Sequence, residues 1–124
     1  MKTEQKTMTT QEVASRLVEL CRKGQIGQAQ EELYDENITS TEPPYAPTKS
    51  ASGKKAVALK GQEFASMVEE RHGGSFSDAL VCGRYFSCAM TLDATFKGKG
   101  RMTLEEICVY EVKDGKIVSE QFFF

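Results

Sequence analysis

Apolar and polar residues alternate along the C-terminal part of the chain in a way that predicts a β-hairpin. Residues 104–112 and 117–124 are rich in Ile, Val, Tyr and Phe, and Asp114-Gly115 lies between them. Two-residue hairpin loops need positive φ, which Asp-Gly adopts at little cost. Because neighbouring strand residues point to opposite faces, the three final phenylalanines place apolar groups on both. We therefore expect helices to cover one face, and a partner chain or more protein the other.

The N-terminal half shows helical rather than alternating spacing. Thr9 and Glu12 stand three residues apart as a capping box, and apolar residues then recur at helical intervals. Residues 22–24, two cations and a glycine, are typical of a helix end. A second, shorter helix is expected over residues 26–34, with Ile26 on its buried side.

Polar stretches separate this pair from a third helix. Residues 35–37 predict a turn, residues 38–41 a short strand, and residues 45–52 a loop. Such a loop is either a mobile lid or only a connection. The third helix is expected over residues 54–71, ended by His-Gly-Gly at 72–74.

The remaining pattern is almost entirely that of strands. Residues 76–83 form one, and residues 85–96 form a longer one with Phe86, Cys88 and Met90 on a single face. Helices followed by a strand meander indicate an α+β fold. We expect a curved, mixed or antiparallel sheet with three N-terminal-half helices packed on its concave face.

Length and charge narrow the classes of protein. The 124 residues suit one domain, expected over residues 9–124 after a disordered tail at residues 1–8. A net charge of −2 argues against a nucleic-acid surface. No apolar run approaches the ~18 residues of a membrane span. The polar start lacks the apolar region of a signal peptide, so we expect a cytoplasmic protein.

Four cysteines, at positions 21, 82, 88 and 108, are spread singly along the chain. In a cytoplasmic protein they indicate reduced, mostly buried thiols. With His72 as the only histidine they form no zinc pattern, so no metal site is expected. No glycine-rich phosphate loop is present, and no cofactor is expected.

The predicted elements follow the order helix, helix, strand, helix and four strands. Within this order, four short stretches carry a resemblance to a known superfamily. They are the helix junction at 22–25, residues 35–38, Gly53 before the third helix and, above all, residues 109–117, VYEVKDGKI. Over residues 9–124 the chain resembles the nuclear transport factor two-like superfamily, and within it the SnoaL-like branch. The resemblance implies a cystatin-like cone, with helices closing over a bent sheet around a pocket and dimers common through the convex face. Such a fold does not by itself define an activity.

The resemblance allows one activity to be checked by position. Ketosteroid isomerase-like members place a Tyr on the first helix, an Asp at the end of the first strand and an acid in the next-to-last strand. The corresponding positions here hold Leu17, Glu42 and Cys108. Leu17 cannot donate a hydrogen bond to an oxyanion, and Cys108 is a weak donor. We therefore expect no standard ketosteroid isomerase and assign no catalytic residue.

A carboxylate is nevertheless expected on the helix side of the sheet. Glu105 and Glu106 point to opposite faces, and the resemblance puts Glu106 on the helix side with Cys108 and Tyr110. There it is either a general acid or base with a raised pKa, or it lies at the wet rim near the start of the strand or pairs with an Arg. The alternations together predict a mostly apolar pocket with acids near its mouth: Leu17, Cys21, Glu42, Phe64, Met67, Phe86, Cys88, Met90, Glu106, Cys108 and Tyr110.

Two functions from different classes remain open. In the first, the cone binds a small, mostly apolar molecule with one or two oxygens, with or without a lyase-, isomerase- or cyclase-type activity. In the second, the chain is a non-catalytic dimeric interaction or scaffolding module whose cone is plugged by its own side chains. Ile107, Val109 and Phe123, on the sheet face away from the helices, predict a homodimer in either case.

Overall fold

The computed structural model describes residues 7–124, so residues 1–6 of the expected tail lie outside it. The helices and strands, in chain order, are α1 (Thr10–Arg22), α2 (Ile26–Leu33), β1 (Tyr34–Thr41), β2 (Ala51–Ser52), α3 (Lys54–Met67), β3 (Val68–Phe76), β4 (Leu80–Cys82), β5 (Tyr85–Phe96), β6 (Gly100–Lys113) and β7 (Lys116–Phe123).

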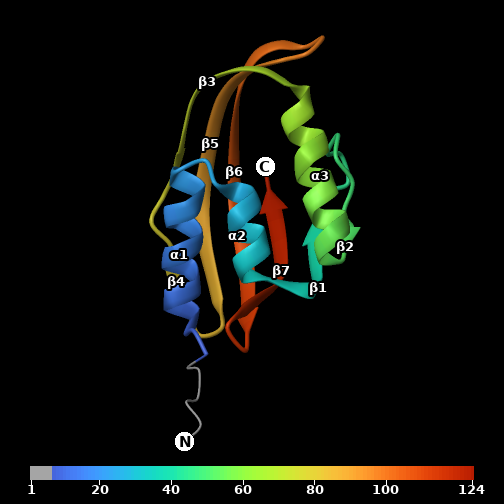
Figure 1. Cartoon of the computed structure of the whole chain (residues 1–124). Helices are drawn as coiled ribbons and strands as arrows, with labels where there is room; N and C mark the ends of the chain where they lie inside the picture. The colour runs from blue at the N-terminus through green and yellow to red at the C-terminus, as the bar shows by residue number, and fades with distance from the viewer. Residues whose placement is uncertain (1–6) are drawn as a thin grey trace, which may run out of the picture.

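The described strands form one open, seven-stranded mixed sheet (Figure 1). Their order is β2-β1-β7-β6-β5-β3, with β4 paired to β5. The β1–β7 pair is parallel and every other pair is antiparallel. All three helices lie on the same face of the sheet (Figure 1). The expected α+β, cystatin-like architecture is therefore confirmed.

Helix α1 begins where the capping box predicts. The Thr9 hydroxyl accepts a hydrogen bond from the Glu12 backbone N–H at 3.1 Å, and the Glu12 carboxylate accepts one from the Thr9 N–H at 2.9 Å. These bonds satisfy donors that a helix N-terminus otherwise leaves without partners. The apolar stripe that follows, including Val13, Leu17 and Leu20, is buried against the sheet.

The C-terminal hairpin is also as predicted. Asp114 and Gly115 have φ of 51° and 76°, the left-handed conformations that a two-residue turn between twisted strands requires. Strand β6 then pairs with β5 so that Cys88 lies opposite Cys108 and Met90 lies opposite Glu106. Glu106 therefore shares the helix-covered face with the buried Cys108, and the expected strand register is confirmed.

The predicted end of the third helix is wrong. Helix α3 ends at Met67, and the chain continues directly as β3, which pairs with β5 from Val68 opposite Phe96 onward. The unpaired backbone groups along this edge of β5 gain partners in this way, which outweighs the helical spacing of the sequence. His72 consequently caps no helix; it lies within β3, with Nε2 2.7 Å from the Thr95 hydroxyl.

Three smaller expectations are also wrong. Residues 35–37 lie within β1 instead of a turn; the strand pairs with β7 at Tyr34 and again from Thr39, with an irregularity of the ladder between them. Ile26 is 47% exposed rather than buried. The single strand expected at residues 76–83 is interrupted, because Ser77 lies beyond the end of β3. Its N–H donates to the Ala89 carbonyl, and its hydroxyl accepts a hydrogen bond from the Ala89 N–H.

The cysteines differ in their surroundings. All four are free; Cys88 and Cys108 are buried, and Cys21 is partly buried. Cys82 is exposed, so the expectation of burial is wrong there. Strand β4, which carries Cys82, is three residues long and is paired only with β5, which leaves it little cover.

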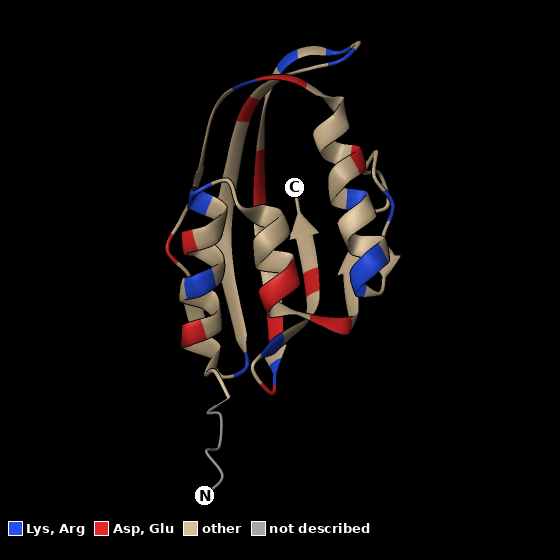
Figure 2. Ribbon diagram, in the orientation of Figure 1, with Lys and Arg blue, Asp and Glu red and all other residues tan. Residues whose placement is uncertain are grey.

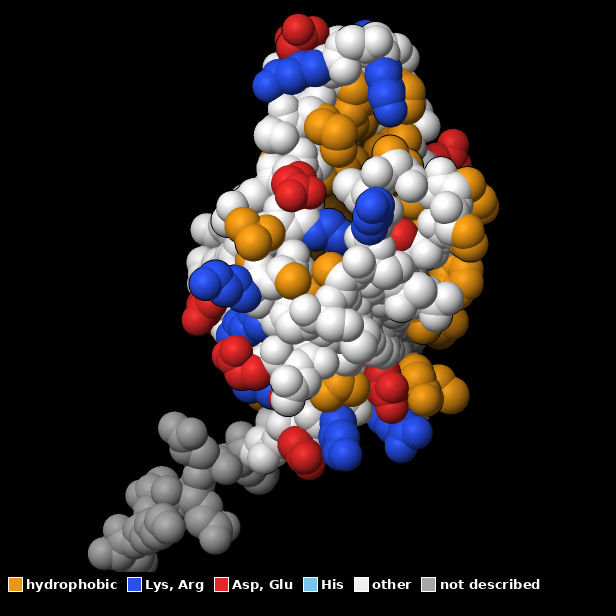
Figure 3. Space-filling view, turned by 90° about the vertical axis from the view of Figure 1, so that its right-hand side faces the viewer, with side chains coloured by type: hydrophobic (Ala, Val, Ile, Leu, Met, Phe, Trp, Pro, Cys, Tyr) orange, Lys and Arg blue, Asp and Glu red, His pale blue; other side chains and the backbone are white. Residues whose placement is uncertain are grey.

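Large apolar side chains lie uncovered on the sheet face opposite the helices, here called the convex face. Ile107 and Phe123 are direct partners across β6 and β7 and are 49% and 48% exposed. Figure 3 shows hydrophobic side chains along its right-hand edge, which is this side of the sheet. The apolar character of the face is as expected, and the homodimer stays a prediction. None of the helices within residues 7–124 is both long and apolar enough to span a bilayer.

Replacing Thr9 by Ala should lower the free energy of unfolding by about 1 kcal/mol, because the capping hydroxyl is lost. Urea denaturation followed by circular dichroism measures the change. Thr10→Ala, one residue further and already helical, is the matched control and should change stability by less than about 0.5 kcal/mol. Equal losses in the two variants would show that the capping box does not stabilise α1.

Candidate functional site

A carboxylate is buried at the centre of the helix-covered face. Glu120, on β7, is 3% exposed. One of its oxygens accepts a hydrogen bond from the Tyr34 hydroxyl, and the other accepts one from the Ser40 hydroxyl at 2.7 Å. Ser40 is the direct neighbour of Glu120 across the parallel β1–β7 pair. Burial raises the pKa of Glu120, against the opposing effect of the two hydrogen bonds.

Lys60 extends this cluster from α3 to the end of β1. Its Nζ donates to the Ser40 hydroxyl at 2.5 Å and to Oε2 of Glu42 at 2.7 Å. The Lys60 and Glu42 side chains are only 12% and 10% exposed, which makes this a shielded ion pair. Nζ also lies 5.2 Å from the centre of the Phe122 ring, within cation–π range. An ammonium has three donors, so one N–H is left after the two bonds found among the described residues.

Glu106 lies on the same face, one strand further along the sheet. Its pKa is raised from 4.5 to about 7, mainly because burial disfavours the charged form. The nearby charges of Glu42 and Glu120 raise this pKa further, and the Lys60 ammonium lowers it. A carboxyl that exchanges protons near neutrality suits a general acid or base.

The balance of charge explains why protons are retained here. Glu42, Glu106 and Glu120 bring three carboxylates to a region where Lys60 supplies the one ammonium found there within residues 7–124, so full ionisation would leave two negative charges without a balancing positive charge. Figure 2 shows acidic stretches on β6 and β7 and basic stretches on α3, which come from facing elements. Like charges in a poorly hydrated interior resist joint ionisation.

Apolar side chains that are only partly buried lie near Glu106 and Lys60, at the edge of the packed core. Met90 is the ladder partner of Glu106, and Lys60 lies over the Phe122 ring. Phe64 on α3 contacts Phe96 edge-on, with ring centres 6.0 Å apart. Figure 3 shows hydrophobic side chains set back in a hollow beside α3, below the tip of the β5–β6 hairpin. The partly buried apolar residues of this region, here called the apolar hollow, are Phe64, Met67, Met90, Leu92, Leu104 and Phe122.

The predicted pocket residues divide into two groups. The first group forms the packed core of the cone: Leu17, Phe86, Cys88, Cys108 and Tyr110 are buried, and Cys21 packs against them. Phe86 and Tyr110 stack with ring centres 4.7 Å apart, so this depth is filled by side chains. The second group is partly exposed and borders the apolar hollow: Glu42, Phe64, Met67, Met90 and Glu106. That these residues contact a ligand stays a prediction.

The sequence patterns did not predict four residues of the polar cluster: Tyr34, Ser40, Lys60 and Glu120. Alternation along the last strand could have predicted the face of Glu120. Glu120 and Phe122 are two residues apart and therefore point to the same face, and the Phe122 ring faces Lys60. Nothing in the local sequence distinguishes Lys60 from the other lysines of α3. Its role depends on the approach of α3 to β1, which sequence spacing does not show.

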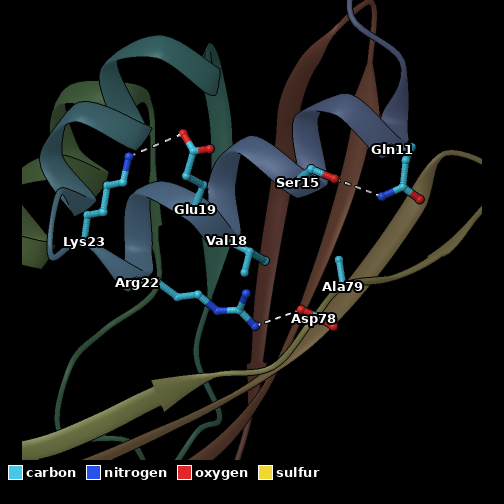
Figure 4. A pocket seen from close by; sticks show the side chains of 8 residues that line it. All are labelled: Gln11, Ser15, Val18, Glu19, Arg22, Lys23, Asp78 and Ala79. Atoms are coloured by element: carbon cyan, nitrogen blue, oxygen red, sulfur yellow. Dashed lines mark hydrogen bonds and ion pairs between the residues drawn. The ribbon is translucent and has the colours of Figure 1, made fainter.

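Other depressions of the surface contain none of this cluster. One, of about 650 Å³, lies between α1 and the segment before β4, and its walls include Ser15, Arg22 and Asp78 (Figure 4). Arg22 bonds Asp78 across it at 2.9 Å. A smaller one, of about 350 Å³, lies beside the β6–β7 turn and is lined in part by Asp35. Within residues 7–124, no group of three or more His, Cys, Asp or Glu side chains is placed to hold a metal ion.

Comparison with known proteins identifies relatives that share nearly the whole fold. The model of the SnoaL-like domain family matches residues 8–124. A Mesorhizobium loti protein of known crystal structure, provisionally named a SnoaL-like polyketide cyclase and also a carbohydrate phosphatase, is 35% identical with a TM-score of 0.88. The match covers 94% of this chain and 100% of that one. The search of curated proteins found no match.

More distant structures agree in fold alone. A Bacillus subtilis protein provisionally named an isomerase is 20% identical, with a TM-score of 0.70 over 93% of this chain and 88% of that one. A Xanthomonas campestris protein of unknown function with a cystatin-like fold is 16% identical, with a TM-score of 0.71 over 94% and 90%. These likenesses show that the fold is shared, and they do not indicate an activity.

The carboxyl of Glu106 should titrate with a pKa of about 7 in the folded protein, followed by ¹³C NMR. Lys60→Met should raise this pKa, because it removes the cation that favours the ionised form. Glu42→Gln should lower it, because it removes a like charge. Lys55→Met changes an exposed lysine of the same helix and should leave the titration unchanged. A titration near 4.5 in the wild type would contradict the assignment.

Proposed function

The chain belongs to the SnoaL-like domain family, and we propose that it binds a small, mostly apolar molecule in the apolar hollow and moves a proton on it. The 35% identical Mesorhizobium relative supports a cyclase-type reaction. Cyclase-, isomerase- and lyase-type reactions on carbonyl compounds share one step, the removal of a proton next to the carbonyl. The four free cysteines are in keeping with a reducing, cytoplasmic location, which is part of the proposal.

The observation that carries the proposal is the environment of Glu106. Its carboxyl has a pKa of about 7 and lies directly across the ladder from Met90, in a wall of apolar side chains. A base works best when its pKa is close to the working pH, because it is then both available and strong enough. Apolar walls with a few polar groups are typical of small-molecule sites.

Lys60 is the second member of the proposed machinery. Removal of a proton next to a carbonyl places negative charge on the carbonyl oxygen, and a preorganised donor stabilises that charge. Ser40 and Glu42 hold two of the three ammonium donors of Lys60. The remaining donor would bind the substrate oxygen, while Glu106 takes the proton. Glu120 acts through Ser40 and is a positioning residue.

The same cluster argues against a phosphatase, the second name of the Mesorhizobium relative. A phosphate monoester carries close to two negative charges at neutral pH. The acidic groups of Glu42 and Glu106 border the hollow, and the Lys60 ammonium is already paired with Glu42. Like-charge repulsion in a partly buried site would oppose such a substrate.

A non-catalytic dimeric module is the second candidate, favoured by a different observation. The deep half of the cone is packed with its own side chains, including Leu17, Phe86 and Tyr110. The convex face leaves Ile107 and Phe123 about half exposed. We propose that a second copy of the chain covers this face, because an uncovered sheet with large apolar side chains is typical of an interface.

Incubation with small enolisable ketones and β-dicarbonyl compounds in D₂O tests the proposed activity. The wild type should speed the exchange of their acidic protons for deuterium, measured by ¹H NMR. Because the ionised carboxylate is the base, the rate should rise with pH through about 7. Glu106→Gln should lower the rate by roughly 10²-fold or more.

Glu105→Gln is the matched control, because this neighbouring carboxylate points to the opposite face of β6 and is exposed. Its rate should equal that of the wild type. Equal loss in both variants, or exchange that is independent of Glu106, would refute the assignment. Dimerisation without any catalysed exchange would favour the interaction module.

Light scattering at micromolar concentration should give the mass of a dimer. Ile107→Glu should convert it to a monomer, because a charge at the centre of an apolar interface remains unpaired. Leu59→Glu also places a charge at an exposed apolar position, on α3 rather than the convex face, and should stay dimeric. A monomeric wild type would rule out the proposed interface.

A further inference from the structure

Two thiols that take no part in the proposed proton transfer lie side by side in the floor of the cone. Cys88 and Cys108 are direct partners in the β5–β6 ladder. They are 5% and 2% exposed, and both are free. The next pair on the same face of the ladder is Met90 and Glu106, which border the apolar hollow. The thiol pair therefore lies one step beneath the hollow.

The register of the ladder suits a covalent bond between these thiols. Residues directly opposite each other in an antiparallel pair have Cα atoms about 4.5–5.5 Å apart. Disulfides join Cα atoms roughly 4.4–6.8 Å apart. Cys88 and Cys108 share the helix-covered face of the sheet, where both are buried. The Cα separation expected for directly opposed residues therefore falls within the range that disulfides span.

We propose that Cys88 and Cys108 are a redox modification site, at which a small peroxide converts the thiol pair into a reversible disulfide. Cys88 is the first sulfur to react. The hydrogen bond from Cys108, followed by the charge of Arg22, lowers the pKa of Cys88, while the pKa of Cys108 is raised. The thiolate is the reactive form of cysteine, so these directions favour Cys88 as the sulfur that attacks and Cys108 as the one that resolves, an order that the single variants test.

The chemistry balances in two steps. The Cys88 thiolate attacks one oxygen of hydrogen peroxide; an S–O bond forms, the O–O bond breaks, and the departing hydroxide takes up a proton to become water. The Cys108 sulfur then attacks the sulfenic sulfur of Cys88; the S–S bond forms, the S–O bond breaks, and a second water leaves with the Cys108 proton. Two thiols lose two electrons in all, and one peroxide becomes two waters.

The position of the pair selects the oxidant. Both sulfurs are buried, so a peptide disulfide such as oxidised glutathione is too large to reach them. Hydrogen peroxide is close to water in size, so it is the oxidant most able to reach them. Cys82 is exposed and Cys21 is partly buried, so these two thiols are the competitors that an experiment must remove.

The test uses the native wild-type protein and the variants Cys21→Ser/Cys82→Ser, Cys88→Ser and Cys108→Ser. Hydrogen peroxide should lower the mass of the wild type and of the double variant by about 2 Da, and dithiothreitol should restore it. Tryptic digestion of the oxidised protein without reductant should release peptides 85–97 and 102–113 joined to each other by the disulfide. Oxidised glutathione should form this link at least tenfold more slowly.

The single variants separate this proposal from other oxidation. Cys88→Ser should form neither the link nor a sulfenic acid on Cys108, whereas Cys108→Ser should accumulate a sulfenic acid on Cys88 that dimedone traps. Circular dichroism checks that each variant is folded. A link from Cys21 to Cys88 in the wild type would overturn the proposal, as would gains of oxygen without loss of about 2 Da in the double variant.

Discussion

The site depends on one buried carboxylate that joins the last strand to the first. A carboxyl group removed from water is costly unless hydrogen bonds replace its hydration, and Tyr34 and Ser40 supply these bonds to Glu120. Both donors lie on β1, so the need to satisfy Glu120 specifies the parallel β1–β7 register. Leaving such a group without one partner costs about 1–3 kcal/mol, more than the bond itself contributes. The position of the Ser40 hydroxyl is thereby fixed. Lys60 donates a hydrogen bond to this hydroxyl, which in turn positions α3.

The same cluster links proton binding to stability. The pKa of Glu106 is raised from 4.5 to about 7 on folding, so between these pH values the folded state holds a proton that the unfolded state has lost. This residue therefore favours the folded state fully below pH 4.5, and its contribution fades as the pH rises through about 7. The two properties have one cause. Burial disfavours the charged form of the carboxyl, which brings its pKa near neutrality and also makes its ionisation destabilising.

Local rules predicted the parts of the fold that local sequence specifies. The Asp114-Gly115 turn, the Thr9 capping box and the alternation along residues 85–96 each depend on neighbours in the chain, and all are present. The strand at residues 68–76 was missed because its need for a partner edge comes from β5, which is distant in sequence. The polar cluster was missed for the same reason, since α3 meets β1 and β7 only in the folded chain.

The pairing of Cys88 with Cys108 beneath Glu106 illustrates how the cone is divided by depth. Its floor is packed, and truncating a large side chain there would cost about 2–5 kcal/mol. The side chains of the apolar hollow, such as Met67 and Leu104, bury less surface and lose less when they change. Substitutions in the hollow should therefore be tolerated better than substitutions in the packed floor. The architecture itself persists at much lower similarity, since a protein only 16% identical has the same fold.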